Sequence, residues 1–184
     1  FTGTGPYTMT DASLAITEDL TIDSGSVIFA TGTLSLGGSF DGSGGTFAHS
    51  SGTILFNSGD TGESIDPGTS DFYNLVFGNG SGGWTIGANA TTTNNFTLST
   101  ASSFTMGSGF TLYVGNVFSN AVGGVATTWT GSTLTLDAGA DYAINSKVSG
   151  GDAYETLNII TDTDISMWNS SATTTNIIAN GSMY

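Results

Sequence analysis

Apolar residues recur along the chain in short alternating pairs, and turn-forming glycine, serine or aspartate stands between one pair and the next. Alternation over three to five residues places one face of a β-strand in a core, whereas an amphipathic helix needs apolar residues three or four positions apart. We therefore predict an all-β chain of many short strands. The first pairs are Leu14/Ile16, Leu20/Ile22, Val27/Phe29 and Leu34/Leu36.

The spacing of these pairs indicates how the strands are connected. Pairs every six to eight residues are closer than the 8–12-residue spacing that is typical of antiparallel sandwiches. From Phe96, steps to Phe104, Phe110 and Val117 describe a coil of about 21 residues with three short strands. We predict a right-handed parallel β-helix, that is, a β-solenoid. The alternative is two tandem β-sandwich domains divided near Phe77.

A longer period of about 80 residues is superimposed on the short one. An aromatic residue, a glycine-rich turn and an aromatic-Thr-apolar triplet occur at the start of the chain and again after Phe77. The matched segments, at offsets of 76 to 80 residues, are Leu20/Ile22 with Phe96/Leu98, Leu36 with Leu112, and Ser51–Phe56 with Gly131–Leu136.

This period predicts one continuous β-solenoid over residues 1–184. Its units are a first repeat at 1–76, a second repeat at 77–158 and a partial third repeat at 159–184. We expect the sheet to pass through residue 77 without a break, and we expect the chain to be a segment of a longer array.

The charge composition excludes one class of partner and disfavours another. The 184 residues contain 15 acidic residues, one basic residue (Lys147), one histidine (His49) and no cysteine, for a net charge of −14. Nucleic acid is excluded because no set of basic side chains could neutralise its phosphates. Binding to an anionic membrane surface is disfavoured for the same reason. No apolar run reaches transmembrane length, so no membrane insertion is expected in this segment.

Two features that resemble catalytic motifs are better explained as turns. Residues 78–83 satisfy G-x-G-x-x-G, but Trp84-Thr85-Ile86 follows as a strand, whereas dinucleotide binding requires a helix. His49 lies in a polar turn and no serine has the G-x-S-x-G context of a hydrolase. One histidine and no cysteine also preclude a His/Cys metal site. We therefore expect the chain not to be an enzyme and to need no cofactor.

The carboxylates are the remaining candidates for chemistry. Asp60, Glu63 and Asp66 lie on one predicted loop, Asp71 follows it, and Asp137 lies near the equivalent loop of the second repeat. The favoured interpretation is solvated acidic loops. Calcium binding by Asp60, Glu63 and Asp66 is an alternative because Ca²⁺ prefers oxygen ligands, and a glycosidase-type acid pair is a second alternative.

Asparagine sequons and tryptophans raise the question of glycans. The three tryptophans, Trp84, Trp129 and Trp168, are interpreted as core packing rather than as platforms for sugar stacking. The sequons could accept glycans on an extracellular chain. They begin at Asn79, Asn89, Asn95, Asn169 and Asn180.

Short strand motifs give the chain a family resemblance over essentially its whole length. The chain resembles the repeats of about 80 residues found in very large bacterial cell-surface proteins, and in style the β-helical passenger regions of autotransporters and filamentous adhesins. The resemblance implies adhesive or filament-forming roles and brings no catalytic residues. The motifs are Gly32–Leu36, Gly52–Phe56, Phe72–Val76, Trp84–Ile86 and Asn95–Leu98.

These observations lead to one functional expectation and one alternative. We expect an extracellular structural protein that forms or extends a surface fibre through contacts between copies, end to end or side by side. The alternative is a carbohydrate-binding or glycan-cleaving adhesin domain whose partners would be surface glycans.

Overall fold

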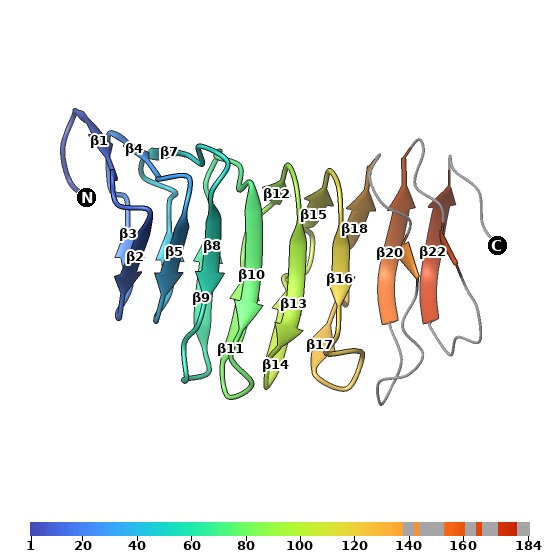
Figure 1. Ribbon diagram of the computed structural model, residues 1–184. Helices are drawn as coiled ribbons and strands as arrows, with labels where there is room; N and C mark the ends of the chain where they lie inside the picture. Colours follow the sequence, from blue (N-terminus) through green and yellow to red (C-terminus); the bar gives the residue numbers. More distant parts are fainter. Residues whose placement is uncertain (138–141, 144–152, 161–164, 167–172, 180–184) are drawn as a thin grey trace.

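The chain forms a parallel β-solenoid of about seven turns. The computed structural model describes residues 1–137, 142–143, 153–160, 165–166 and 173–179. Successive coils stack into a rod with β1 near one end and β22 near the other (Figure 1). All strand pairings in the described residues are parallel and these residues contain no helix, which confirms the predicted fold class. The β-sandwich alternative is wrong, because a sandwich would pair its strands antiparallel.

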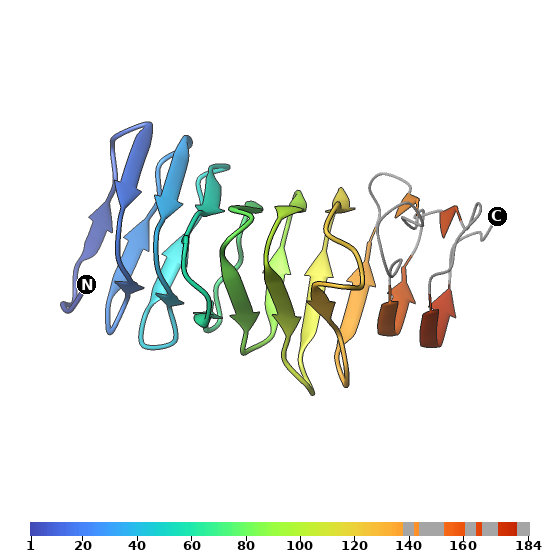
Figure 2. The same cartoon turned by 90° about the horizontal axis from the view of Figure 1, so that it is seen from below.

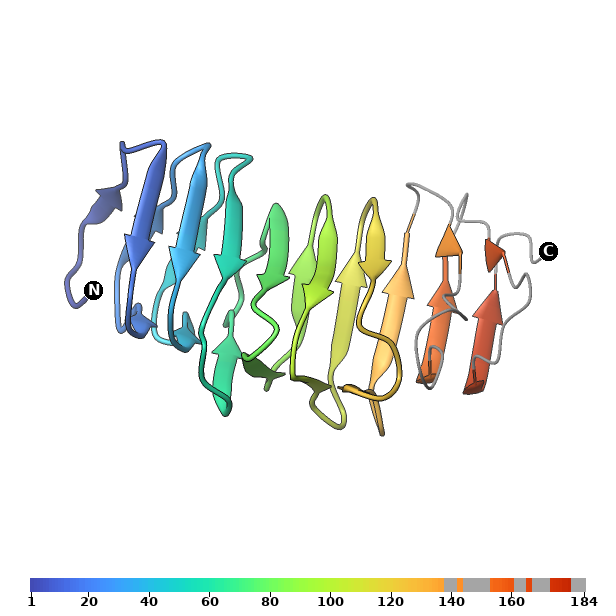
Figure 3. The same cartoon turned by 60° about the horizontal axis from the view of Figure 1, so that its bottom comes forward.

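Each coil contributes one strand to each of three faces, which are visible as separate rows of strands when the rod is turned (Figures 2 and 3). The first row, face I, is one six-stranded sheet. Its strands are β2 (Ser13–Ile16), β5 (Thr33–Leu36), β8 (Thr53–Phe56), β10 (Asn74–Gly78), β13 (Phe96–Thr100) and β16 (Phe118–Asn120).

Face II is a second six-stranded sheet that follows face I along the chain in every coil. Its strands are β3 (Leu20–Thr21), β6 (Phe40–Asp41), β9 (Glu63–Asp66), β11 (Gly83–Ile86), β14 (Ser103–Met106) and β17 (Thr127–Thr128).

Face III is divided into two sheets. Between them lies a coil in which Phe72 alone forms a bridge, to Thr92. The first sheet contains β1 (Pro6–Thr8), β4 (Ser26–Ile28) and β7 (Thr46–Ala48). The second contains β12 (Ala90–Thr92), β15 (Thr111–Val114), β18 (Thr133–Leu136), β20 (Ala153–Ile159) and β22 (Thr173–Ala179). A further short pair joins β19 (Tyr142–Ala143) and β21 (Ile165–Ser166).

The core is built from like residues stacked in register along the rod. On face I, Leu75 pairs with Phe96 above and with Ile54 below, and all three are buried. Aromatic rings of neighbouring coils stack directly, with centroids 5.3 Å apart for Phe56 and Phe77. Each inward ladder removes apolar surface at every coil, so the stability of the rod is a sum of coil and neighbour contributions.

The coil length sets which residues are neighbours. Leu34 pairs with Ile54, 20 residues on, and Phe96 pairs with Phe118, 22 residues on. These spacings bracket the coil of about 21 residues that the apolar pattern predicts. A three-sided coil that keeps parallel register needs this constancy, because a slip of one residue would turn every buried side chain outward.

The 80-residue period does not correspond to a whole number of coils. Leu20 lies on face II, but its sequence match Phe96 lies on face I. Likewise Leu36 lies on face I and its match Leu112 on face III. The matched residues are eleven strand positions apart, with Phe72 counted as the fourth position of face III, and therefore three and two-thirds turns apart.

The seam between the first two repeats lies within a continuous sheet. Strand β10, which contains Phe77, pairs with β8 on one side and with β13 on the other. The register shifts by one residue between Phe77 and Gly78, where a small bulge begins the turn towards β11.

Candidate functional site

The acidic loop between faces I and II is organised around Glu63. Both carboxylate oxygens of Glu63 accept hydrogen bonds, from the Ser39 hydroxyl at 2.7 Å and from the Ser58 hydroxyl at 2.9 Å. Ser39 in turn accepts the Ser64 amide and Ser58 accepts the Asp60 amide. Glu63 is thus held as part of a corner that joins two coils, with its acceptor positions already engaged.

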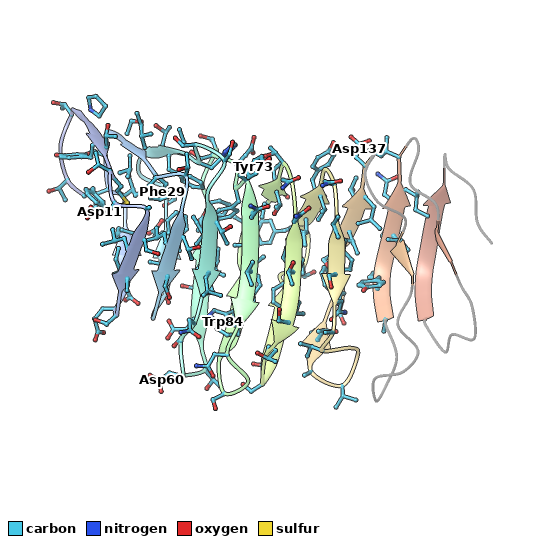
Figure 4. All side chains as sticks on the ribbon, in the orientation of Figure 1. Asp11, Phe29, Asp60, Tyr73, Trp84 and Asp137 are labelled. Carbon is cyan, nitrogen blue, oxygen red and sulfur yellow. The ribbon has the colours of Figure 1, made fainter. Side chains whose placement is uncertain are left out.

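The other two calcium candidates point elsewhere. Asp60 is exposed on the turn before β9, where Figure 4 shows it directed away from the rod. Asp66 ends β9, three residues and about 10 Å beyond Glu63, and its Oδ1 accepts the Gly68 amide at 2.8 Å. The structure therefore does not bring Asp60, Glu63 and Asp66 together, and the part of the chain that it describes contains no group of three or more His, Cys, Asp or Glu side chains able to hold a metal.

His49 lies in a tight turn after β7, as the sequence predicts, and it is half-buried there. Its Nδ1 accepts the backbone amide of Ser51 at 3.3 Å, and its ring lies against the Tyr73 ring with centroids 5.3 Å apart. Ser50 and Ser51 have φ of 41° and 65°, a left-handed conformation that is uncommon for residues other than glycine. The imidazole stabilises a strained turn, and the serine atom that it contacts is a backbone nitrogen rather than a nucleophilic hydroxyl.

The glycine-rich segment at 78–83 is a turn between two strands, as predicted. Asn79 organises it, because its carbonyl accepts the Gly82 amide and its side-chain oxygen accepts the Ser81 amide. A Cβ on Gly82 would lie 2.4 Å from the carbonyl oxygen of Ser58, so glycine is required by the close approach of the coil below. The strand β11 follows at once, and no helix N-terminus is present to receive a phosphate.

Two of the three tryptophans belong to the core. Trp84 is 1% exposed and Trp129 is 2% exposed, and each packs against other aromatic rings. Neither can serve as a surface platform for a sugar ring. Trp168 lies outside the described residues.

A row of asparagines at the edge of face I escapes the sequence analysis. The Asn116 amide donates to Asn94 Oδ1 at 2.9 Å, Asn94 donates to Asn74 Oδ1 at 2.8 Å, and Asn74 donates to the Thr53 hydroxyl at 3.2 Å. Asn95 joins the row by accepting a second bond from Asn116. The available signal was the recurrence of asparagine every 20 to 22 residues, which is the coil period.

The described sequons differ in how their side chains are used. Asn79 donates to the Asn57 carbonyl at 3.3 Å, and Asn95 belongs to the asparagine row. Asn89 is exposed, and its Oδ1 accepts the Thr111 amide at 2.9 Å. Asn169 and Asn180 lie outside the described residues.

A hydroxyl–carboxylate pair on face III joins two coils of the second repeat. Tyr113 donates its hydroxyl to Asp137 Oδ2. That hydrogen bond, together with burial and the nearby negative charge, raises the pKa of Tyr113 to about 12. On face II, the Ser43 hydroxyl and amide lower the pKa of Asp41, which closes a tight turn. Both carboxylates have structural partners.

The outer surface of the rod thus consists of hydroxyl, amide and carboxylate groups that mostly bond to the next coil. No helix in the described residues could span a membrane. Comparison of the chain with protein-family models, with curated proteins and with solved structures finds no match.

Proposed function

We propose that this chain is a structural segment of an extracellular, cell-surface fibre, which it forms or extends through contacts between copies and without catalysis. One observation carries the proposal: face I continues through six coils in unbroken parallel register, with like side chains stacked beneath it. A fold of this kind gains length by adding coils, and its core is renewed at each addition.

The first coil shows how such a rod could be extended. Bonds from the Thr33 amide to the Ala12 carbonyl and from the Gly37 amide to the Ile16 carbonyl place the even-numbered residues of β2 towards β5. The amide of Ala15 therefore faces away from β5. An edge with this pattern can accept a coil of the same chain or the edge of another copy.

Electron microscopy of the purified chain tests the proposal, together with fibre diffraction. We expect unbranched rods or filaments with a repeat of about 4.8 Å along the axis, because the strands lie across it. Isolated monomers at high concentration would overturn the proposal.

An Ala15→Pro variant makes this test specific. Proline removes the outward amide of β2 and leaves the bonds to β5 in place, so filaments should shorten or disappear. The matched Ala15→Val variant keeps the amide and should assemble like the parent chain. Circular dichroism of both variants checks that the solenoid has folded.

A further inference from the structure

Charge is distributed unequally over the three faces of the rod. The chain carries 15 acidic residues, yet the six strands of face I contain no Asp, Glu, Lys, Arg or His. Their outward positions hold hydroxyl, amide and small apolar side chains. The central outward row is Ala15, Ser35, Leu55, Val76, Thr97 and Ser119.

The other two faces lack this combination of continuity and neutrality. The strands of face II include Asp41, Glu63 and Asp66. Face III includes Glu155 in β20 and is interrupted between β7 and β12. Among the described strands, only face I presents six neighbouring strands without a formal charge.

Face I is also inexpensive to remove from water. Along one edge, the amides of Asn74, Asn94 and Asn116 are hydrogen-bonded to one another from coil to coil, so their bonds survive when water is excluded. At its centre, Leu55 and Val76 are neighbours in register and both are half-buried, which leaves an apolar strip on the surface.

We propose that face I is the surface through which two copies of this chain pack side by side. The occupant follows from the charge: with a net charge of −14 and one basic residue, two copies cannot pair through salt bridges. They repel each other wherever carboxylates meet, and face I is where two sheets can approach with the fewest carboxylates between them. The contact is isologous, sheet against sheet, with Leu55 and Val76 at its centre.

The size of the surface sets the strength of the contact. Six strands about 4.8 Å apart and four residues long give a flat area on the order of 400 Å². A stable interface buries about 800 Å² on each partner. A single pair is therefore weak, and longer rods associate more tightly because coils act together. The inference rests on the proposed fibre function, to which it adds the face used for lateral contact.

Cysteine cross-linking detects such a weak contact, since the natural chain contains no cysteine. Val76→Cys places a thiol at the centre of face I, and Thr85→Cys places one on face II in the same coil. A short bismaleimide should link Val76→Cys chains into dimers about fivefold more than Thr85→Cys chains, despite the greater exposure of Thr85. Labelling with a monomaleimide normalises thiol reactivity. Equal dimer yields after normalisation would overturn the proposal.

A charge variant tests the same contact without a cross-linker. Val76→Glu and Thr85→Glu add the same charge on adjacent strands. Light scattering at millimolar protein should show weaker association for Val76→Glu and no change for Thr85→Glu, while high salt should strengthen association of the parent chain by screening its carboxylates. Equal effects of the two variants would contradict the proposal.

Electron microscopy separates this inference from the proposed function. Single-width filaments of Val76→Glu beside bundled filaments of the parent chain would support both. Cross-linked Val76→Cys dimers without any filaments would retain the lateral contact and refute the fibre. Filaments whose bundling is unchanged by Val76→Glu would retain the fibre and refute the lateral contact.

Discussion

The first two repeats have the same order of strands and yet present their matching residues on different faces. Phe40 in the first repeat lies on face II, and its match Phe118 in the second lies on face I. Both are buried, Phe40 against Phe47 and Phe72, and Phe118 against Phe96 and Trp129. The alternation of apolar and polar residues thus specifies a strand and its buried side, but not the face of the rod.

The cause is the number of strand positions in a repeat. Eleven positions in a three-sided coil turn each repeat by one face relative to the preceding one. In a longer array with the same period, a surface feature would return to its original face after three repeats. The loops of Asp60 and Asp137, which the sequence matches, accordingly lie at different corners, as Figure 4 shows.

The largest expected effect comes from the matched core phenylalanines. Phe40→Ala and Phe118→Ala should each lower the free energy of unfolding by about 3–5 kcal/mol, because each leaves a cavity in a dry aromatic stack. Urea unfolding followed by circular dichroism measures both. A large loss for one variant and none for the other would show that the two repeats are not equally packed.

Matched glycines should differ strongly between the repeats. Gly5 and Gly82 precede the aromatic-Thr-apolar triplets of the first and second repeat. A Cβ at Gly5 has nothing within 4 Å, whereas one at Gly82 meets the Ser58 carbonyl and the Trp84 ring. Gly82→Ala should therefore cost about 1–3 kcal/mol in unfolding experiments, and Gly5→Ala should leave the midpoint unchanged. Equal midpoints for the two variants would contradict the close packing of the second turn.

The asparagine row distinguishes the middle coils from the first coils. Asn94→Ala removes bonds to Asn74 and Asn116 and should cost about 1–3 kcal/mol, since the row is partly buried. Thr33→Ala, on the same face two coils before Asn74, serves as the control and should change the midpoint little. Denaturant titrations of the two variants give the comparison, and similar losses would mean that the row adds no specific stability.

The smallest effect is a pH dependence confined to the second repeat. Folding raises the pKa of Tyr113 from about 10 to about 12. The stabilisation is therefore complete below the unfolded pKa and is lost as pH rises through the folded one. Amide exchange near β15 and β18 should accelerate above pH 10 relative to β5, and Tyr113→Phe should abolish the difference. Equal acceleration at β5 would argue for general alkaline unfolding.

The sequence revealed the strands and coil length because both depend on local alternation. Leu14/Ile16 and Phe96/Leu98 identify inward positions without knowledge of any neighbour. The face assignment and the asparagine row could not be predicted in this way, because they depend on summing loop lengths over several coils. The acidic loop was misleading for a related reason: Glu63 and Asp66 are close in sequence but lie at opposite ends of β9.

Paired cysteines test the account most directly. Val76 and Thr97 are neighbours in register on face I, whereas Thr21 and Thr97 are matched by the repeat and lie on different faces. At high dilution, the double variant Val76→Cys/Thr97→Cys should oxidise to an intramolecular disulfide, because neighbouring strands bring Cα atoms to about 5 Å. Thr21→Cys/Thr97→Cys should remain reduced. A disulfide in the second pair and none in the first would contradict the solenoid register and the turn of one face per repeat.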